Sequence, residues 1–225
     1  MTKEGYIHVC FIIDESGSMY YSTNDVIGGF KSTIEEQKKE KEGKCTVSLF
    51  KFNNDVNEVY LGKDVSEINE IDYAAHGCTA MNDGIGTAID KVGKWLSDMK
   101  EEDRPSKNLI IIMTDGQENA SKEYSFDRIK EMIKHQEEKY NWTFMYMGTD
   151  ITSMEDVKKL GIKMSAFSSR KDYASNYTVV NEATKLYRSL KCDVASAAAT
   201  MDAFLSTEAD AMTTKYEAEN NIKLL

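Results

Sequence analysis

Two continuous apolar runs, both rich in β-branched residues, constrain the fold of this chain more than any other feature. They span Tyr6–Ile13 and Asn108–Met113, and each leads into a loop that carries an aspartate. A strand with one face in water alternates apolar and polar residues, whereas a strand without alternation is covered on both faces. The two runs therefore predict central strands of a parallel sheet, with helices on either side.

The rest of the chain up to residue 168 alternates helical and strand patterns. Helices are expected at about 25–42 and 81–99, after Ser125 as an N-cap, and at Ser153–Leu160, and strands at 45–52, 56–62, 141–148 and 162–168. The turn sequence Asn-Asn-Asp between 45–52 and 56–62 favours an antiparallel hairpin. This order predicts an α/β fold: a doubly wound, mostly parallel sheet with one antiparallel edge strand and helices on both faces.

Only helical patterns follow residue 168. Apolar residues recur at helical spacing over 179–190 and again over 194–205. We therefore expect one domain at 1–168 and a C-terminal helical extension at 169–225.

The composition argues against several classes of function. The 225 residues carry a net charge of −10, and an acidic chain without clustered Lys and Arg is not expected to bind nucleic acid. The sequence shows neither a membrane-spanning apolar stretch nor a secretory signal, so a cytoplasmic location is expected. The four cysteines include no Cys-x-x-Cys pair, and we expect reduced thiols, with Cys10 and Cys45 buried in strands.

Oxygen-bearing side chains follow both apolar runs and also precede the helix expected at 81–99. Asp14, Ser16 and Ser18 follow the first run, Asp115 follows the second, and Thr79 lies in the loop before that helix. Doubly wound sheets bind ligands beyond the carboxyl ends of their strands, where these loops are expected to meet. A set of oxygens with two carboxylates and no His or Cys suits a hard divalent cation, above all Mg²⁺, with Mn²⁺ and Ca²⁺ as alternatives.

Most of these polar residues also have a purely structural interpretation. Asp-x-Ser-x-Ser by itself is compatible with a helix N-cap, and Thr79 with the N-cap of the helix that follows it. Glu118 and Asn119 are interpreted as polar residues at the start of a helix, and Asp83 as a first-turn residue that complements the helix dipole. His76 is expected to be solvated in its loop.

Three segments together resemble the von Willebrand factor A domain: DESGSM at 14–19, GCTAMNDGI at 77–85 and IIIMTDGQENAS at 110–121. The resemblance covers residues 5–168 in order and spacing. The chain resembles stand-alone A-domain proteins of bacteria and their phages, which often act as adaptors, more than secreted adhesive matrix proteins. The resemblance implies a metal-ion-dependent adhesion site. In that site the hydroxyls of Ser16, Ser18 and Thr79 coordinate the metal, Asp14 and Asp115 bind it directly or through water, and a carboxylate of a partner protein completes the shell.

The expected function is therefore Mg²⁺-dependent binding of a protein partner that supplies an Asp or Glu, without enzymatic activity. Tyr20 and Tyr21, which follow the first motif, either line a binding surface or are buried under a loop. One alternative is a metal-dependent hydrolase or phosphotransferase that uses the same oxygens. A nucleophilic Ser16 or Ser18 with His76 as base is a separate enzymatic hypothesis, for which the sequence shows no third orienting group. Another is a structural or virion protein whose metal serves stability only.

Overall fold

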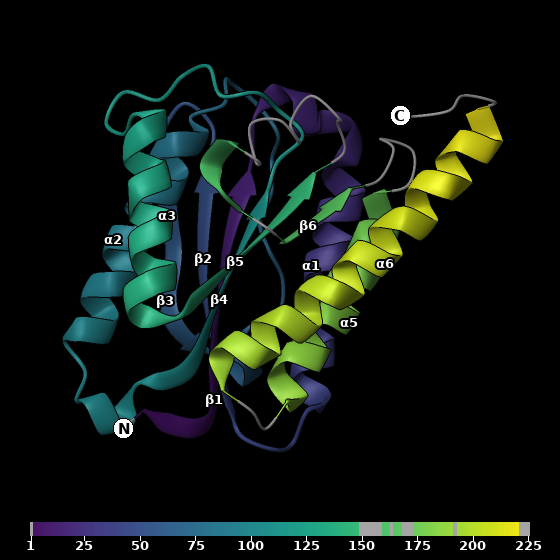
Figure 1. The fold of residues 1–225 in the computed structure, drawn as a ribbon. Coiled ribbons are helices and arrows are strands. Elements are labelled where there is room, and N and C mark those ends of the chain that lie inside the picture. The colour runs from purple at the N-terminus through teal and green to yellow at the C-terminus, as the bar shows by residue number, and fades with distance from the viewer. Residues whose placement is uncertain (1, 149–158, 163, 168–172, 191–192, 221–225) are drawn as a thin grey trace.

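The computed structural model describes residues 2–148, 159–162, 164–167, 173–190 and 193–220, and its centre is a six-stranded sheet (Figure 1). The strands are β1 (Lys3–Asp14), β2 (Lys44–Phe52), β3 (Val56–Asp64), β4 (Pro105–Met113), β5 (Trp142–Gly148) and β6 (Met164–Phe167). Their order is β3-β2-β1-β4-β5-β6, and every neighbouring pair is parallel except β2 and β3. The predicted fold class, including the antiparallel edge strand, is confirmed.

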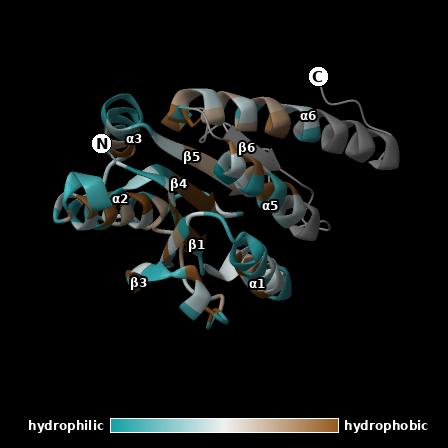
Figure 2. Cartoon of the chain, turned by 90° about the horizontal axis from the view of Figure 1, so that it is seen from below, coloured by the Kyte–Doolittle hydropathy of each residue, from teal (hydrophilic) through white to brown (hydrophobic). Residues whose placement is uncertain are grey.

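Helices cover both faces of this sheet. They are α1 (Thr23–Lys39), α2 (Met81–Ser97), α3 (Phe126–Tyr140), α5 (Tyr173–Ser189) and α6 (Val194–Asn220), with short 3₁₀ helices η1 (Gly17–Ser22), η2 (Val65–Glu67) and η3 (Glu101–Asp103). Figure 2 shows α2 and α3 on one side of the central strands and α1 and α5 on the other. The C-terminal helix α6 runs along α5 and β6.

The two faces of the sheet divide the core into two clusters. In β1, Val9, Phe11 and Ile13 join the cluster under α1 and α5, while Cys10 and Ile12 join the cluster under α2 and α3. None of these five side chains is more than 1% exposed. Successive residues of a strand point to opposite faces, and both faces of β1 are covered. This explains why its sequence is apolar without alternation.

Expectations for the thiols and for membrane spans can be compared with the structure. Cys10 and Cys45 are buried in β1 and β2 as predicted, Cys78 is exposed, and all three are free cysteines. Among the described helices, none has the length and hydropathy needed to cross a bilayer.

The boundaries of α1 differ from the sequence prediction. The pattern predicts a helix over 25–42, whereas α1 begins earlier, directly after η1, and ends at Lys39. Arg188 of α5 donates to the carbonyl oxygens of Glu40 and Glu42, both at 3.2 Å. The guanidinium, which comes from a distant part of the sequence, thus binds carbonyls of the segment that follows the last turn of α1.

The ends of α3 follow local signals. Its N-cap is Ser125, as predicted, whose hydroxyl accepts a hydrogen bond from the Arg128 amide at 3.3 Å. Its C-cap is Asn141, which adopts a left-handed backbone with φ of 53°. The helix predicted for Ser153–Leu160 lies for the most part outside the described residues.

The two helices predicted after residue 168 are present as α5 and α6, and both contribute to the core. Tyr187 of α5 is buried, and its hydroxyl lies 2.9 Å from that of Thr143 in β5. Lys107 of β4 donates to the Tyr187 carbonyl at 2.5 Å. Met201 and Leu205 of α6 belong to the same cluster as the inner residues of β1. The division of the chain at residue 168 stays a prediction.

Candidate metal centre

The carboxyl ends of β1 and β4 lie side by side at one edge of the sheet. Their register pairs Ile13 with Met113, so the loops that follow the two strands begin at the same level. The chain continues from β1 to α1 on one face, and from β4 to α3 on the other face. Open α/β sheets bind ligands in the crevice where connections separate in this way.

The loop after β1 is organised by Asp14. Its Oδ1 accepts a hydrogen bond from the Ser16 amide at 2.6 Å, and its Oδ2 accepts one from the Thr114 hydroxyl at 2.5 Å. The hydroxyl oxygens of Ser16 and Ser18 lie 3.0 Å apart. Asp14 and Ser16 are buried, whereas Ser18 is exposed. The loop therefore presents a carboxylate and two hydroxyls, the outermost of which reaches the surface.

Gly116, in the loop after β4, shows that oxygens from two other segments face the space beside it. A Cβ built on Gly116 would lie 3.0 Å from Thr79 Oγ1, 3.3 Å from Ser18 Oγ and 3.4 Å from Asp14 Oδ2. These atoms belong to the loops before α2 and after β1. The glycine thus leaves open a small space that neutral hydroxyls and a carboxylate surround, which is the donor set that a hard cation takes.

Asp115 is the second carboxylate at this edge of the sheet. It is 5% exposed, and its charge is close enough to raise the pKa of Asp14. Burial is the larger cause and raises the pKa of Asp14 to about 6, although hydrogen bonds from Thr114 and Ser16 lower it. Two buried carboxylates at close range favour a cation between them, because the cation offsets both burial and repulsion.

The structure thus brings four predicted site residues together and places the fifth beside them. Asp14, Ser16, Ser18 and Thr79 are connected by the contacts above, and Asp115 is next to Gly116 in the chain. Within the described residues, no group of three or more His, Cys, Asp or Glu could hold a metal ion. A cation here would therefore depend on the hydroxyls. The ligand roles stay predictions.

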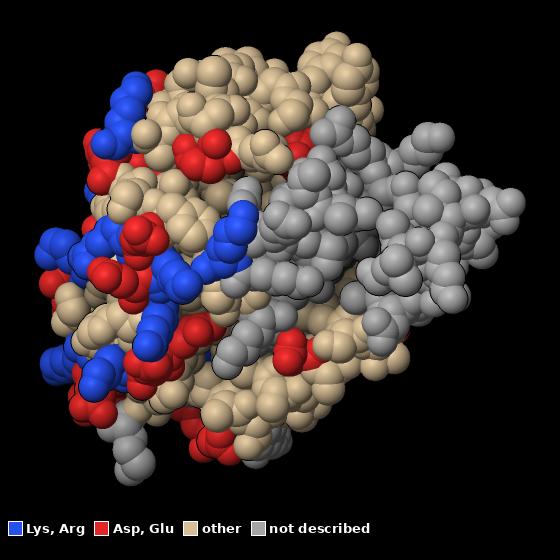
Figure 3. All heavy atoms as spheres, turned by 45° about the horizontal axis from the view of Figure 1, so that its top comes forward, with Lys and Arg blue, Asp and Glu red and all other residues tan. Residues whose placement is uncertain are grey.

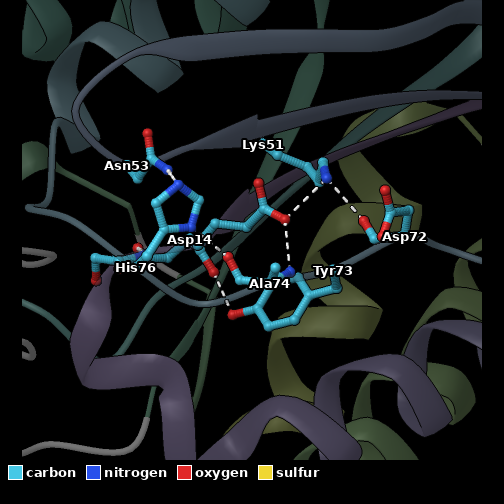
Figure 4. A network of polar contacts seen from close by, with 9 residues as sticks. Asp14, Lys51, Asn53, Asp72, Tyr73, Ala74 and His76 are labelled. Carbon is cyan, nitrogen blue, oxygen red and sulfur yellow. Dashed lines mark hydrogen bonds and ion pairs between the residues drawn. The ribbon is translucent and has the colours of Figure 1, made fainter.

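A buried ion pair holds the loop after β1 against the segment that leads to Thr79 (Figure 4). Lys51 of β2 donates to Glu15 Oε1 at 2.8 Å and to the Asp72 carbonyl at 2.7 Å. The same Glu15 oxygen accepts the Ala74 amide at 3.1 Å. Glu15 and Lys51 are each 8% exposed. This network connects two loops that both carry proposed ligands.

Sequence reasoning missed this support. Its one signal is Lys51, a charged residue inside the otherwise apolar end of β2, because a buried lysine needs a buried partner. Tyr73 adds a second connection that no local pattern indicates, since its hydroxyl donates to the Asp14 carbonyl at 2.6 Å.

The ring of His76 contacts groups other than the two serines. Its Nδ1 lies 2.7 Å from the Ala74 carbonyl, and its Nε2 lies 3.2 Å from Asn53 Nδ2 (Figure 4). The carbonyl requires a proton on Nδ1, so Nε2 accepts from the amide. These contacts give no support to His76 as a base for Ser16 or Ser18.

Glu118 and Asn119 bind the backbone around the start of α2. The Glu118 carboxylate accepts from the Asn82 amide at 2.8 Å, and Asn119 Oδ1 accepts from the Thr79 amide at 3.0 Å. The N-cap position of α2 is Ala80, so the N-cap interpretation of Thr79 is wrong. The loop after β4 therefore fixes the backbone of Thr79 and leaves its hydroxyl facing Gly116.

Asp83 does more than complement the dipole of α2. It lies in the first turn, as interpreted from the sequence, but its carboxylate accepts the backbone amides of residues 122–124 at 2.7–2.9 Å. A buried carboxylate with three amide donors is well satisfied. This contact anchors the far end of the loop that begins at Asp115.

Tyr20 and Tyr21 lie at the surface beside the candidate site. They are 67% and 94% exposed, which decides between the two interpretations: neither is buried under a loop. Their rings contact each other at a centroid distance of 5.5 Å.

Solved structures similar to this chain share its fold. The manganese-loaded TRAP protein of Plasmodium vivax has a TM-score of 0.52 and 17% identity, with 76% of this chain and 72% of that chain covered. The vWF domain of the type V pili tip protein Mfa5 from Porphyromonas gingivalis has a TM-score of 0.59 and 10% identity, with 83% and 97% covered.

A third similar structure is proximal thread matrix protein 1 from the mussel byssus, solved with zinc in its MIDAS motif. Its TM-score is 0.55 at 16% identity, and 80% of this chain is covered. The chain spans only 46% of that protein's length. At such identities the likeness concerns the fold.

The family assignment comes from the sequence. No curated protein matches the chain. The family model of the von Willebrand factor type A domain matches residues 8–188, a stretch that runs from β1 into α5 and includes all five proposed ligands. The chain therefore belongs to the von Willebrand factor type A domain family.

Proposed function

We propose that this chain is a Mg²⁺-dependent protein-binding module. Asp14, Ser16, Ser18, Thr79 and Asp115 hold the metal, and an Asp or Glu of the partner protein completes its shell. The observation that carries the proposal is that oxygens of Asp14, Ser18 and Thr79, from two separate segments, face the glycine that follows Asp115.

The chemistry of the donors supports a hard divalent cation. All five side chains offer oxygen, and only two of them carry charge. Mg²⁺ is the first candidate, with Mn²⁺ and Ca²⁺ as alternatives. Two of the similar structures contain metal: the Plasmodium vivax protein manganese and the byssus protein zinc.

Access to the site supports a partner from outside the chain. Ser18 is exposed and Gly116 is half-buried, so the space between the loops opens to the surface. When bound, the metal supplies a positive charge that attracts a carboxylate oxygen. The three hydroxyl ligands are neutral and leave that attraction in place. The site would therefore favour a carboxylate from another molecule as the remaining ligand.

Partner capture tests the proposal directly. The full chain is immobilised as wild type and as Asp14→Ala, and each is exposed to a cell extract in Mg²⁺ or in EDTA. We expect partner capture only by wild type in Mg²⁺. A partner retained equally in all four samples would refute the metal bridge.

Metal affinity tests the ligand set without a partner. Calorimetric titration of the wild type with MgCl₂ or MnCl₂ should show binding. Ser18→Ala should lower the metal affinity about 10- to 100-fold, the range typical of disturbed metal sites. Ser97→Ala is the matched control, because Ser97 is an exposed serine at the end of α2. Equal affinities in the two variants would remove Ser18 from the site.

The two alternative functions predict different results. A hydrolase or phosphotransferase would turn over generic ester or phosphate substrates in Mg²⁺, and Asp14→Ala would abolish that turnover. A protein whose metal serves stability would lose thermal stability in Asp14→Ala and still retain its partner.

Cellular context belongs to the same proposal. We place the module in the cytoplasm, as an adaptor of bacterial or phage type. The free thiols of Cys10, Cys45 and Cys78 are compatible with a reducing compartment.

A further inference from the structure

Two exposed aromatic rings lie next to the proposed metal site without a role in it. Tyr20 and Tyr21 of η1 lie two and three positions after Ser18 and are among the exposed large hydrophobic residues of the described chain. Their rings meet edge to face, with an interplanar angle of 85°. Paired rings left in water at the rim of a binding site offer contact area to a partner.

The loops around the site are predominantly acidic, although the loop after β4 also carries Lys122, which lines a pocket with Asp55. The described segments 14–25, 53–55, 72–80 and 114–121 contain no Lys or Arg. Their acidic residues outside the proposed ligand set are Glu15, Asp25, Asp55, Asp72 and Glu118. Of these five, Glu15 forms an ion pair with Lys51. In Figure 3, most of the visible Lys and Arg lie on the left, interleaved with Asp and Glu.

These acidic residues are able to act on an approaching partner. Asp55 and Asp72 are exposed, and Asp25 and Glu118 are half-buried. Charges at a surface act over roughly 8 Å at physiological ionic strength. A divalent cation balanced by Asp14 and Asp115 contributes no net charge, so the acidic rim dominates at longer range. An isolated partner carboxylate would be repelled before it reached the metal.

We propose that the partner's acidic ligand residue lies within a basic patch, and that a Lys or Arg beside it packs on Tyr20 and Tyr21. The inference rests on the proposed function and specifies its partner. The rim attracts the basic patch, the metal binds the single carboxylate, and the two rings accept the cation over their faces. Each element of the surface then has a counterpart in the partner.

A displayed library of random peptides tests the charge pattern. Peptides are selected on the immobilised full chain in MgCl₂ and eluted with EDTA, which recovers only metal-dependent binders. We expect these peptides to contain an Asp or Glu flanked by Lys or Arg more often than the starting library. Carboxylates flanked by neutral or acidic residues would overturn the inference and leave the proposed function intact. If EDTA elutes no binder, both fall.

Variants of the chain test the residues, with one enriched peptide as the probe. Tyr21→Ala should weaken binding about two- to fivefold, the range of an exposed cation–π contact. Tyr140→Ala is the control, since Tyr140 is 59% exposed at the end of α3. Asp72→Asn should weaken binding and reduce its dependence on NaCl, while Glu102→Gln in η3 should change neither. If the Tyr21 and Asp72 variants bind like wild type, the inference is wrong.

Discussion

The contact between α1 and α5 gives the sharpest stability prediction, because neighbouring glycines of α1 face different surroundings. A Cβ on Gly29 would lie 2.1 Å from two ring carbons of Tyr177, whereas a Cβ on Gly28 would meet nothing within 4 Å. Tyr177 is 3% exposed, and its hydroxyl donates to the Val26 carbonyl at 3.2 Å. In Gly29→Ala the ring has to move by more than 1 Å or the helices have to separate, given an ordinary carbon contact of about 3.5 Å.

The magnitude follows from what the displaced ring loses. Overpacking costs about 1–3 kcal/mol, and a lost hydrogen bond costs about 1 kcal/mol more. We therefore expect Gly29→Ala to reduce the free energy of unfolding by about 2–4 kcal/mol. Gly28→Ala should instead raise it by about 0.5–1 kcal/mol, because alanine is the better helix former.

Denaturant unfolding of the full chain, followed by circular dichroism, measures both values. For a chain of this size the Gly29→Ala change corresponds to a fall in Tm of about 5–15 °C. If the two substitutions had the same effect within about 0.5 kcal/mol, the packing of α5 on α1 would be refuted.

Three further predictions concern the site and the core. Gly116→Ala should lower Mg²⁺ affinity more than tenfold in calorimetry, because its methyl group faces the proposed ligands. Gly93→Ala is the control and should leave the affinity unchanged, because a Cβ at Gly93 meets nothing within 4 Å. Equal affinities in the two variants would contradict the proposed site. Burial lowers the pKa of His8 to about 3, so between pH 6.5 and about 3 only the unfolded state gains a proton. The free energy of unfolding should therefore fall by up to about 1.4 kcal/mol for each pH unit in this window, and His8→Gln should flatten the slope in urea titrations; an unchanged slope would exclude His8 as the cause. Lys51→Met leaves Glu15 buried without its ion-pair partner and should lower the free energy of unfolding by about 3–5 kcal/mol. Adding Glu15→Gln should recover part of this loss. A loss below about 1 kcal/mol would mean that the ion pair contributes little to stability.

Features set by short stretches of chain were predictable from the sequence. The continuous apolar run at Tyr6–Ile13 became β1, and Ser125 caps α3. Both depend on residues within a few positions of each other: the strand on a run of side chains that need burial, and the cap on one hydroxyl and one nearby amide. The order of such elements was enough to predict a doubly wound sheet.

The candidate ligands were predictable from the sequence as residue types, but their proximity to one another is visible only in the folded chain. Motif spacing selects Asp14 and Thr79, which are 65 positions apart in the sequence (79 − 14). Only the folded chain shows oxygens of both near one glycine. The N-cap interpretation of Thr79 failed for the same reason, because the loop after β4 fixes where that residue's backbone lies.

The sequence by itself therefore determined the strands, most of the helices, and which side chains are chemically suited to hold a cation. Tertiary structure decided how Glu15 and Lys51 pair, where α1 ends against Arg188, and that Tyr20 and Tyr21 stay in water. The physical reason is range: apolar periodicity and caps act over a turn or a strand, whereas burial and ion pairing depend on which distant segments become neighbours.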